Sequence, residues 1–261
     1  MTAASDAGLF GKPDESRDYL PLLRWMVVIS LVVFGTVVLS YFGLIQLMME
    51  TDRTRLSLLI LAIFVITSLH CFVQTLVVSR ELSATRRVRD QIVGAAGALQ
   101  MRGDRIIAAD GHELQPGVLS RHIANLFRKA DLQGGRRLDQ TLLLRSLADR
   151  LRSREKLGWF VAEALLRLAL LGTAVGFILM LVPIAGLTSF DVDTLRSALA
   201  GMSSGMAIAL NVTVTGIATA LVLKLEYYFL DEDIAELFHQ ITEITEVYVV
   251  SALERGADGG R

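Results

Sequence analysis

Four long apolar stretches divide the chain: Trp25–Leu47, Leu56–Val78, Leu168–Leu187 and Ser204–Leu223. Each has about 20 residues, the length that a helix needs to cross the hydrocarbon core of a bilayer. The first stretch follows a polar N-terminus and is too long for the core of a signal peptide, so we interpret it as a retained span. The pattern predicts an all-α membrane protein with four transmembrane helices.

The polar residues around the spans also show helical periodicity. Ser79–Gln100 continues the second span and Leu138–Lys156 leads into the third, each with apolar residues at roughly helical spacing. Between them, Leu119–Lys129 predicts a short helix, and turn signals make Arg105–Leu114 a candidate small hairpin. After the fourth span, apolar residues recur in steps of three and four, which predicts a C-terminal helix that packs against a partner through Ile234, Leu237, Ile241, Ile244 and Tyr248.

Basic residues predict the orientation of the spans. Arg80–Lys156 holds 16 of the 26 Lys and Arg residues and 9 Asp and Glu residues, whereas the two short links hold only Arg53, Arg55 and Arg196. Because Lys and Arg are enriched in cytoplasmic loops, we expect this loop and both termini to be cytoplasmic. The same rule explains the basic loop, so we expect no nucleic-acid partner. The predicted organisation is a cytoplasmic N-terminal segment (1–23), spans 1 and 2 (24–79), a basic, mainly helical cytoplasmic loop domain (80–156), spans 3 and 4 (157–228), and a cytoplasmic C-terminal helix and tail (229–261).

Composition indicates the class of protein and limits the kinds of site that the chain can contain. With 52% hydrophobic residues and a formal net charge of −1, the chain matches an integral membrane protein. Its single cysteine, Cys71, allows no disulfide within one chain and reads as a small apolar filler. The sequence has no metal-ligand spacing and no nucleophile–His–acid set. We therefore expect no enzyme activity, no cofactor and no metal.

Two polar side chains near the spans allow two interpretations each. His70, in the second span, is either a hydrogen-bonded packing residue or a proton relay. Glu163 and Arg167 are four residues apart before the third apolar stretch, so they can form an ion pair at the membrane surface. Alternatively, Glu163 is an acid at the inner mouth of a pore that accepts ions leaving it.

The third and fourth apolar stretches contain hydroxyl and amide groups in place of charges. They include Thr173 in the third span and Asn211, Thr213 and Thr215 in the fourth. A lone membrane threonine usually bonds a carbonyl of its own helix. Here, however, small residues at four-residue spacing let helix backbones approach closely around the hydroxyls. We expect the following residues to serve helix and oligomer packing: Gly172, Gly176, Gly201, Gly205, Ala209 and Gly216.

These residues form two motifs, Leu171-Gly172-Thr173-x-x-Gly176 and Ala209-Leu210-x-x-Thr213-x-x-Gly216. Their order and spacing on the last two spans resemble the MotA/TolQ/ExbB proton-channel family, the stator subunits of ion-driven motors. The resemblance covers roughly Arg152–Tyr228. It implies a homo-oligomer, a pentamer in the family, in the lipid bilayer of the bacterial inner membrane. It also implies a single-span partner, MotB/TolR/ExbD-like, which carries a membrane aspartate.

On this resemblance, Thr173 and Thr213 match the pore-facing threonines of the family. We add Asn211, Thr215 and Glu163 to the predicted ion pathway. The four-span topology is closer to the flagellar stator subunit than to the three-span TolQ and ExbB. Ile208 and Val222 stand where ExbB-like members carry a glutamate and a proline, so the resemblance does not specify which process receives the work.

The polar residues of the last two spans also indicate an incomplete proton pathway. Proton transport needs a group that can change its protonation state near the bilayer centre, and the third and fourth apolar stretches contain no carboxylate. An aspartate from a partner would complete the pathway, with threonine hydroxyls as its hydrogen-bond donors. The alternative is a non-conducting four-span scaffold or sensor, whose threonines only pack and whose basic loop binds a cytoplasmic partner or anionic lipid.

Overall fold

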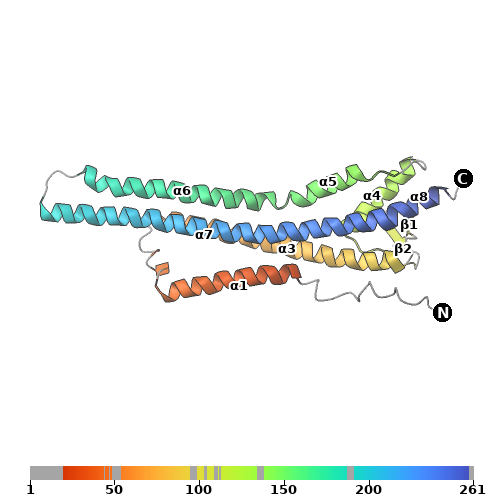
Figure 1. Cartoon of the computed structure of the whole chain (residues 1–261), viewed down its shortest axis with the longest axis horizontal. Coiled ribbons are helices and arrows are strands. Elements are labelled where there is room, and N and C mark those ends of the chain that lie inside the picture. Colours follow the sequence, from red (N-terminus) through yellow and green to blue (C-terminus); the bar gives the residue numbers. More distant parts are fainter. Residues whose placement is uncertain are drawn as a thin grey trace, which may run out of the picture. The chain divides into compact units, whose positions relative to one another are not determined.

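A computed structural model of the chain describes residues 20–43, 45–46, 48, 54–94, 99–102, 105–108, 111, 113–133, 138–186 and 191–258. In this part, four helices are long and apolar enough to cross a membrane, which confirms the all-α fold class (Figure 1). Residues 1–19 of the predicted N-terminal segment and residues 49–53 of the first link lie outside the described residues. The second predicted link is shorter than expected, because α7 already begins at Val192. The elements are α1 (Leu20–Tyr41), α3 (Leu56–Gly94), β1 (Leu99–Arg102), β2 (Arg105–Ala108), α4 (Val118–Gln133), α5 (Thr141–Arg152), α6 (Lys156–Ala185), α7 (Val192–Ile244), the π-helix η2 (Thr245–Val250) and α8 (Ser251–Asp258).

The chain divides into two compact units. The membrane unit comprises residues 25–74 and 154–230, and it contains α6 together with the N-terminal parts of α3 and α7 and most of α1. The loop unit comprises residues 75–153, 231–258 and the start of α1, as far as these are described. It contains the hairpin, α4, α5, η2 and α8.

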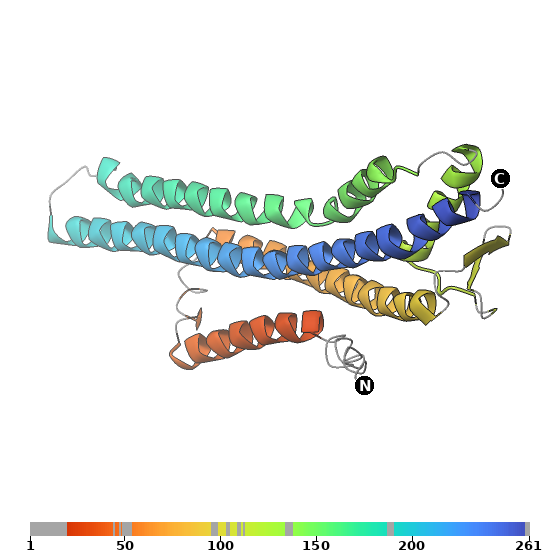
Figure 2. The ribbon, with the colours of Figure 1, turned by 45° about the vertical axis from the view of Figure 1, so that its right-hand side comes forward.

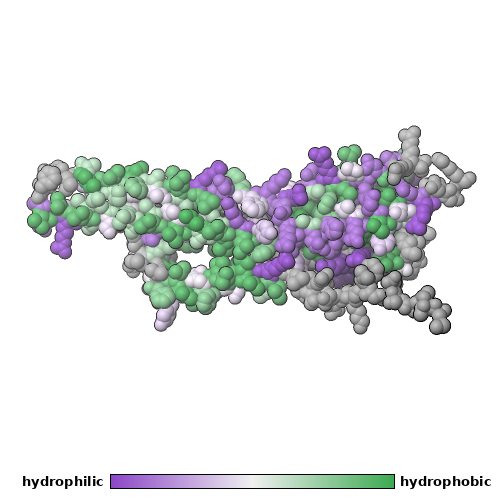
Figure 3. Space-filling view, in the orientation of Figure 1, coloured by the Kyte–Doolittle hydropathy of each residue, from purple (hydrophilic) through white to green (hydrophobic). Residues whose placement is uncertain are grey.

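The membrane unit exposes large apolar side chains on several helices. Leu31 of α1, Leu170 of α6 and Val214 of α7 are 69%, 73% and 67% exposed, and Figure 3 shows hydrophobic side chains covering α1, α6 and the first part of α7. Such faces are stable only against lipid or another subunit. Trp25 and Phe72 join α1 to α3, with ring centroids 4.4 Å apart.

The first helix is shorter than the sequence predicts. The apolar pattern continues to Leu47, but α1 ends at Tyr41 and the chain turns at Phe42 and Gly43. Gly43 has a φ of +69°, a left-handed conformation that glycine adopts without strain. The α1 helix therefore does not continue through this turn.

The loop unit corrects the predicted boundary after the second span. We expected a helix to Gln100, but α3 ends at Gly94 and Leu99–Arg102 forms strand β1. Strand β1 pairs antiparallel with β2, as Figure 2 shows, so the hairpin begins earlier than predicted. Within the predicted Arg105–Leu114 hairpin, the described residues form one isolated β-bridge, between Ile107 and Glu113.

The other predicted helices of the loop unit are present, but the helix expected over Leu138–Lys156 spans only Thr141–Arg152, and a turn at residues 153–155 separates it from α6. The expected Leu119–Lys129 helix lies within α4, whose residues Leu119, Ile123 and Leu126 are buried at the spacing of one helix face. Helix α5 begins after Asp139, which accepts hydrogen bonds from the backbone nitrogen and the hydroxyl of Thr141. These bonds lower the pKa of the Asp139 carboxyl.

The C-terminal helix buries most of the predicted apolar seam. Ile234, Leu237, Ile241 and Ile244 are all at most 3% exposed. Tyr248 is only half-buried, and Val249 takes the buried position instead. The reason is that residues 245–250 form a π-helix, whose wider turn shifts the inward face by one residue.

Candidate functional site

Thr173 of α6 and Thr213 of α7 face each other in the membrane unit. Their hydroxyl oxygens are 2.5 Å apart, and both side chains are half-buried. Each hydroxyl also lies within hydrogen-bond distance of the carbonyl four residues earlier, Ala169 for Thr173 and Ala209 for Thr213, at 3.0 and 2.8 Å. The structure therefore brings together the two threonines that the sequence singles out.

This arrangement has more acceptors than hydrogens. The two hydroxyls have one hydrogen each, whereas three acceptors are within reach: two carbonyls and whichever threonine oxygen accepts from the other. One acceptor must therefore always go without a hydrogen from the pair. Because a hydroxyl hydrogen can rotate from one acceptor to another, either hydroxyl can also donate to an acceptor that comes from outside the pair.

The two helices can bring the hydroxyls this close because small residues line the contact. A methyl group added at Gly172 would lie 2.2 Å from Val212 Cγ1, and one added at Gly216 would lie 2.3 Å from Ala169 Cβ. Four further predicted packing residues belong to the same contact, which is within one chain: Gly176 against Ala209, Gly205 against Met180, and Gly201 against Pro183. Their role between subunits stays a prediction.

Asn211 and Thr215 flank Thr213 at a distance of two residues, so they lie on other faces of α7. The Thr215 hydroxyl donates to the Asn211 carbonyl at 2.8 Å and lies 3.5 Å from Met48 Sδ. Asn211 is half-buried. The structure thus does not bring Thr215 to the threonine pair, and the ion-pathway role of both residues stays a prediction.

Glu163 and Arg167 form the predicted ion pair along α6. Arg167 Nη2 is 3.3 Å from Glu163 Oε1, and both side chains are exposed, at 76% and 50%. Exposed pairs of this kind stabilise a protein little. The geometry is that of an ion pair at the surface of the unit, and the role of Glu163 at a pore mouth stays a prediction.

A buried carboxyl group on α7 is not among the residues predicted from the sequence. Glu226 is only 1% exposed and accepts a hydrogen bond from the Ser68 hydroxyl of α3 at 2.9 Å. The apolar window ends at Leu223, so Glu226 looked like an ordinary polar residue after the span. One signal could have found it, because Thr219, Glu226 and Asp233 recur every seven residues and would share one helix face.

His70 also has partners in the membrane unit. Its Nδ1 is 2.9 Å from the Tyr227 hydroxyl, and its Nε2 is 3.4 Å from Gln74 Nε2. The Tyr227 ring fills the space beside Gly158, where an added methyl group would lie 2.1 Å from the ring. These contacts fit the interpretation of His70 as a hydrogen-bonded packing residue. Cys71 beside it is fully buried.

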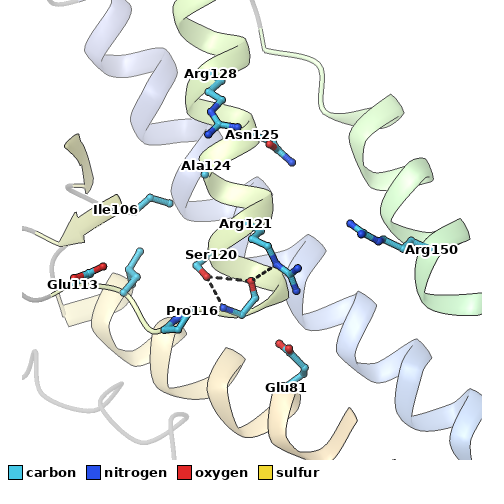
Figure 4. A pocket seen from close by; sticks show the side chains of 12 residues that line it. Glu81, Ile106, Glu113, Pro116, Ser120, Arg121, Ala124, Asn125, Arg128 and Arg150 are labelled. Atoms are coloured by element: carbon cyan, nitrogen blue, oxygen red, sulfur yellow. Dashed lines mark hydrogen bonds between the residues drawn. The ribbon is translucent and has the colours of Figure 1, made fainter. Parts of the chain in front are cut away.

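The loop unit contains a groove with a volume of about 670 Å³. Arg121, Arg128 and Arg150 line it together with Glu81 and Glu113, as Figure 4 shows. The Glu81 carboxylate accepts the first backbone N–H of α4, from Val118, at 2.9 Å. The groove thus has a basic side, and the N-terminus of α4 is already capped.

His122 lies in the core of the loop unit, 4% exposed. Burial lowers its pKa, and a hydrogen bond with the Gln140 side chain opposes this shift in part. In the described residues, no group of three or more His, Cys, Asp or Glu side chains is placed to hold a metal ion.

Comparison with known families confirms the resemblance. Residues 122–243 match the model of the MotA/TolQ/ExbB proton channel family, which places both threonines, the glycines between them and Glu226 within the matched segment. No curated protein matches the chain. The family is one of membrane ion channels, and the four apolar helices agree with a multi-pass membrane protein.

Proposed function

We propose that this chain is the channel-forming stator subunit of an ion-driven motor complex. Several copies, five on the family pattern, surround a single-span MotB/TolR/ExbD-like partner that carries a membrane aspartate. Proton or sodium flow past that aspartate drives a mechanical step. The complex lies in the bacterial inner membrane with both termini of this chain in the cytoplasm.

The observation that carries this proposal is the pair of hydroxyls on Thr173 and Thr213, 2.5 Å apart. Both side chains are half-buried, so a helix from outside the subunit can reach them. A charged carboxylate in a membrane is costly unless hydrogen-bond donors surround it. Because each hydroxyl hydrogen can rotate from one acceptor to another, one of them can turn to a partner carboxylate and return when that group is protonated.

The sequences of spans 3 and 4 indicate which group the partner must supply. The apolar windows Leu168–Leu187 and Ser204–Leu223 contain no Asp or Glu, so the titrating group at their centre must come from the partner. At a proton-motive force of about 150 mV, each proton would release about 3.5 kcal/mol. That is enough to drive a conformational or rotational step.

A second candidate is the non-conducting scaffold or sensor. The bonds from Thr173 and Thr213 to carbonyls of their own helices favour it, because a purely structural threonine makes the same bonds. The groove lined by Arg121, Arg128 and Arg150 is suited to an acidic cytoplasmic partner. This candidate predicts no ion flux.

Reconstitution separates the two candidates. The partner is sought as a short neighbouring gene whose product has one N-terminal span with an aspartate. Vesicles that contain this chain and that partner should conduct ions, whereas vesicles with this chain alone, or with the partner's aspartate changed to asparagine, should not. Absence of flux in all three preparations, with the complex assembled, would favour the scaffold.

A further inference from the structure

The membrane unit contains a carboxyl group that the proposed mechanism does not use. Glu226 lies on α7 against α3 and is 1% exposed, so it is buried even in a single subunit. Its Oε1 accepts a hydrogen bond from the Ser68 hydroxyl at 2.9 Å. Its Oε2 is buried and has no hydrogen-bond partner in the described part of the chain.

This environment is incomplete for a carboxylate. Within the described residues, Glu226 forms no ion pair with Lys or Arg, and a single hydroxyl is its only donor. A buried negative charge needs a counter-charge or several donors. A proton on Oε2 removes the charge, and the Ser68 bond to Oε1 is compatible with both states because a carboxylic acid keeps one accepting oxygen.

Polar side chains near Ser68 and Glu226 in the sequence have partners other than the carboxyl. On α3, Cys71 is fully buried and His70 bonds the hydroxyl of Tyr227, the residue after Glu226. The guanidinium of Arg154 is engaged with the Gln74 side chain at 3.3 Å. Within the part of the chain that the structure describes, these contacts supply no fixed positive partner for Glu226.

Glu226 lies apart from the threonine pair. It follows Thr213 by 13 residues on the same helix. At 1.5 Å and 100° per residue, the two positions are about 20 Å apart along α7 and about 140° apart around it. Thr213 faces α6 whereas Glu226 faces α3, so the two groups form separate sites.

We propose that Glu226 is a proton-binding site of this chain, held by Ser68 where α3 and α7 meet in the membrane unit. In this proposal, Glu226 takes up transported protons on the cytoplasmic side of the hydroxyl pair. The transport role rests on the proposed channel function. The binding of a proton does not, because every group that forms the site belongs to this chain. The chain therefore contributes a titrating group of its own, in addition to the partner's aspartate.

Infrared difference spectroscopy of the purified chain without its partner tests the binding site. A protonated, buried carboxyl band should be present at neutral pH and disappear as the pH is raised to about 9. Glu226→Gln should remove the band, whereas Glu243→Gln, the same change at an exposed position of α7, should leave it. Ser68→Ala should shift its frequency, because the hydrogen bond to the carboxyl is lost. A band that survives Glu226→Gln, or no such band in the native chain, would overturn the proposal.

Flux through the reconstituted complex tests the transport role. Glu226→Gln keeps the side-chain volume and the bond from Ser68, so the complex should assemble but lose its proton flux. Glu243→Gln should conduct normally. Unchanged flux in assembled Glu226→Gln would overturn the transport role. A titrating band in the chain alone, with no flux in the native complex, would instead refute the channel function and leave the binding site in place.

Discussion

Gly176 of α6 and Ala209 of α7 lie so close that a methyl group added at Gly176 would be 2.6 Å from the Ala209 side chain and 2.7 Å from its backbone nitrogen. No carbon fits at that distance without moving a helix. The contact lies one turn from both Thr173 and Thr213, since each is three or four residues away. Small residues at this crossing therefore determine how far apart the two hydroxyls are.

Gly176→Ala should destabilise the subunit by about 1–3 kcal/mol, because the added methyl group forces α6 and α7 apart. Gly35→Ala is the matched control, since nothing lies within 4 Å of the methyl group that it adds to α1. Thermal unfolding in detergent should show a lower midpoint for Gly176→Ala only. Equal midpoints for both variants would show that α6 and α7 are not held at this distance.

The threonine pair could be predicted from sequence because its signals are local. Hydroxyls and glycines stand out in an apolar span, and their four-residue spacing places them on one helix face. Glu226 could not be found in the same way. It follows the apolar window, where polar residues are expected. Only its contact with Ser68, on helix α3 of the same chain, shows that it is buried. Burial between helices is a tertiary property that a hydropathy window does not contain.

The boundary errors have a similar cause. Leu99–Arg102 consists of residues that favour a helix, so the sequence predicts that the helix after span 2 continues. Pairing with Arg105–Ala108 outweighs this preference. No recognisable sequence motif marks the π-helix at 245–250, yet this helix moves the buried position from Tyr248 to Val249.

Cysteine labelling in intact cells tests the topology. The basic loop predicts that Gln115→Cys is protected from a membrane-impermeant thiol reagent, whereas Val192→Cys, 83% exposed between spans 3 and 4, reacts. The native Cys71 is buried, so the unmodified chain should give little background. Labelling of Gln115→Cys together with protection of Val192→Cys would invert the orientation of the protein.

Acid should destabilise the loop unit through His122. Burial lowers the pKa of His122 in the folded chain, so below its ordinary value of 6.5 the unfolded chain binds more protons than the folded one. The contribution of His122 to stability is therefore complete above that pH and is lost as the pH falls below it. Unfolding of the native chain at pH values on both sides of 6.5 should show this loss.

His122→Gln should reduce the loss of stability in acid, whatever its effect on stability at neutral pH, because glutamine does not titrate. His239→Gln removes an exposed histidine from α7 and should leave the dependence unchanged. If the free energy of unfolding falls with pH by the same amount in the native protein and in His122→Gln, another group causes the loss of stability.

Ion flux through reconstituted complexes carrying Thr213→Val or Thr213→Ser, measured together with the yield of assembled complex, tests the central claim most directly. Valine keeps the shape of threonine and removes the hydroxyl, whereas serine keeps the hydroxyl and loses a methyl group. If the Thr213 hydroxyl serves the partner carboxylate, Thr213→Val should assemble without conducting, and Thr213→Ser should keep part of the flux. Normal flux in Thr213→Val, with loss of assembly in Thr213→Ser, would instead show that the residue only packs α6 against α7.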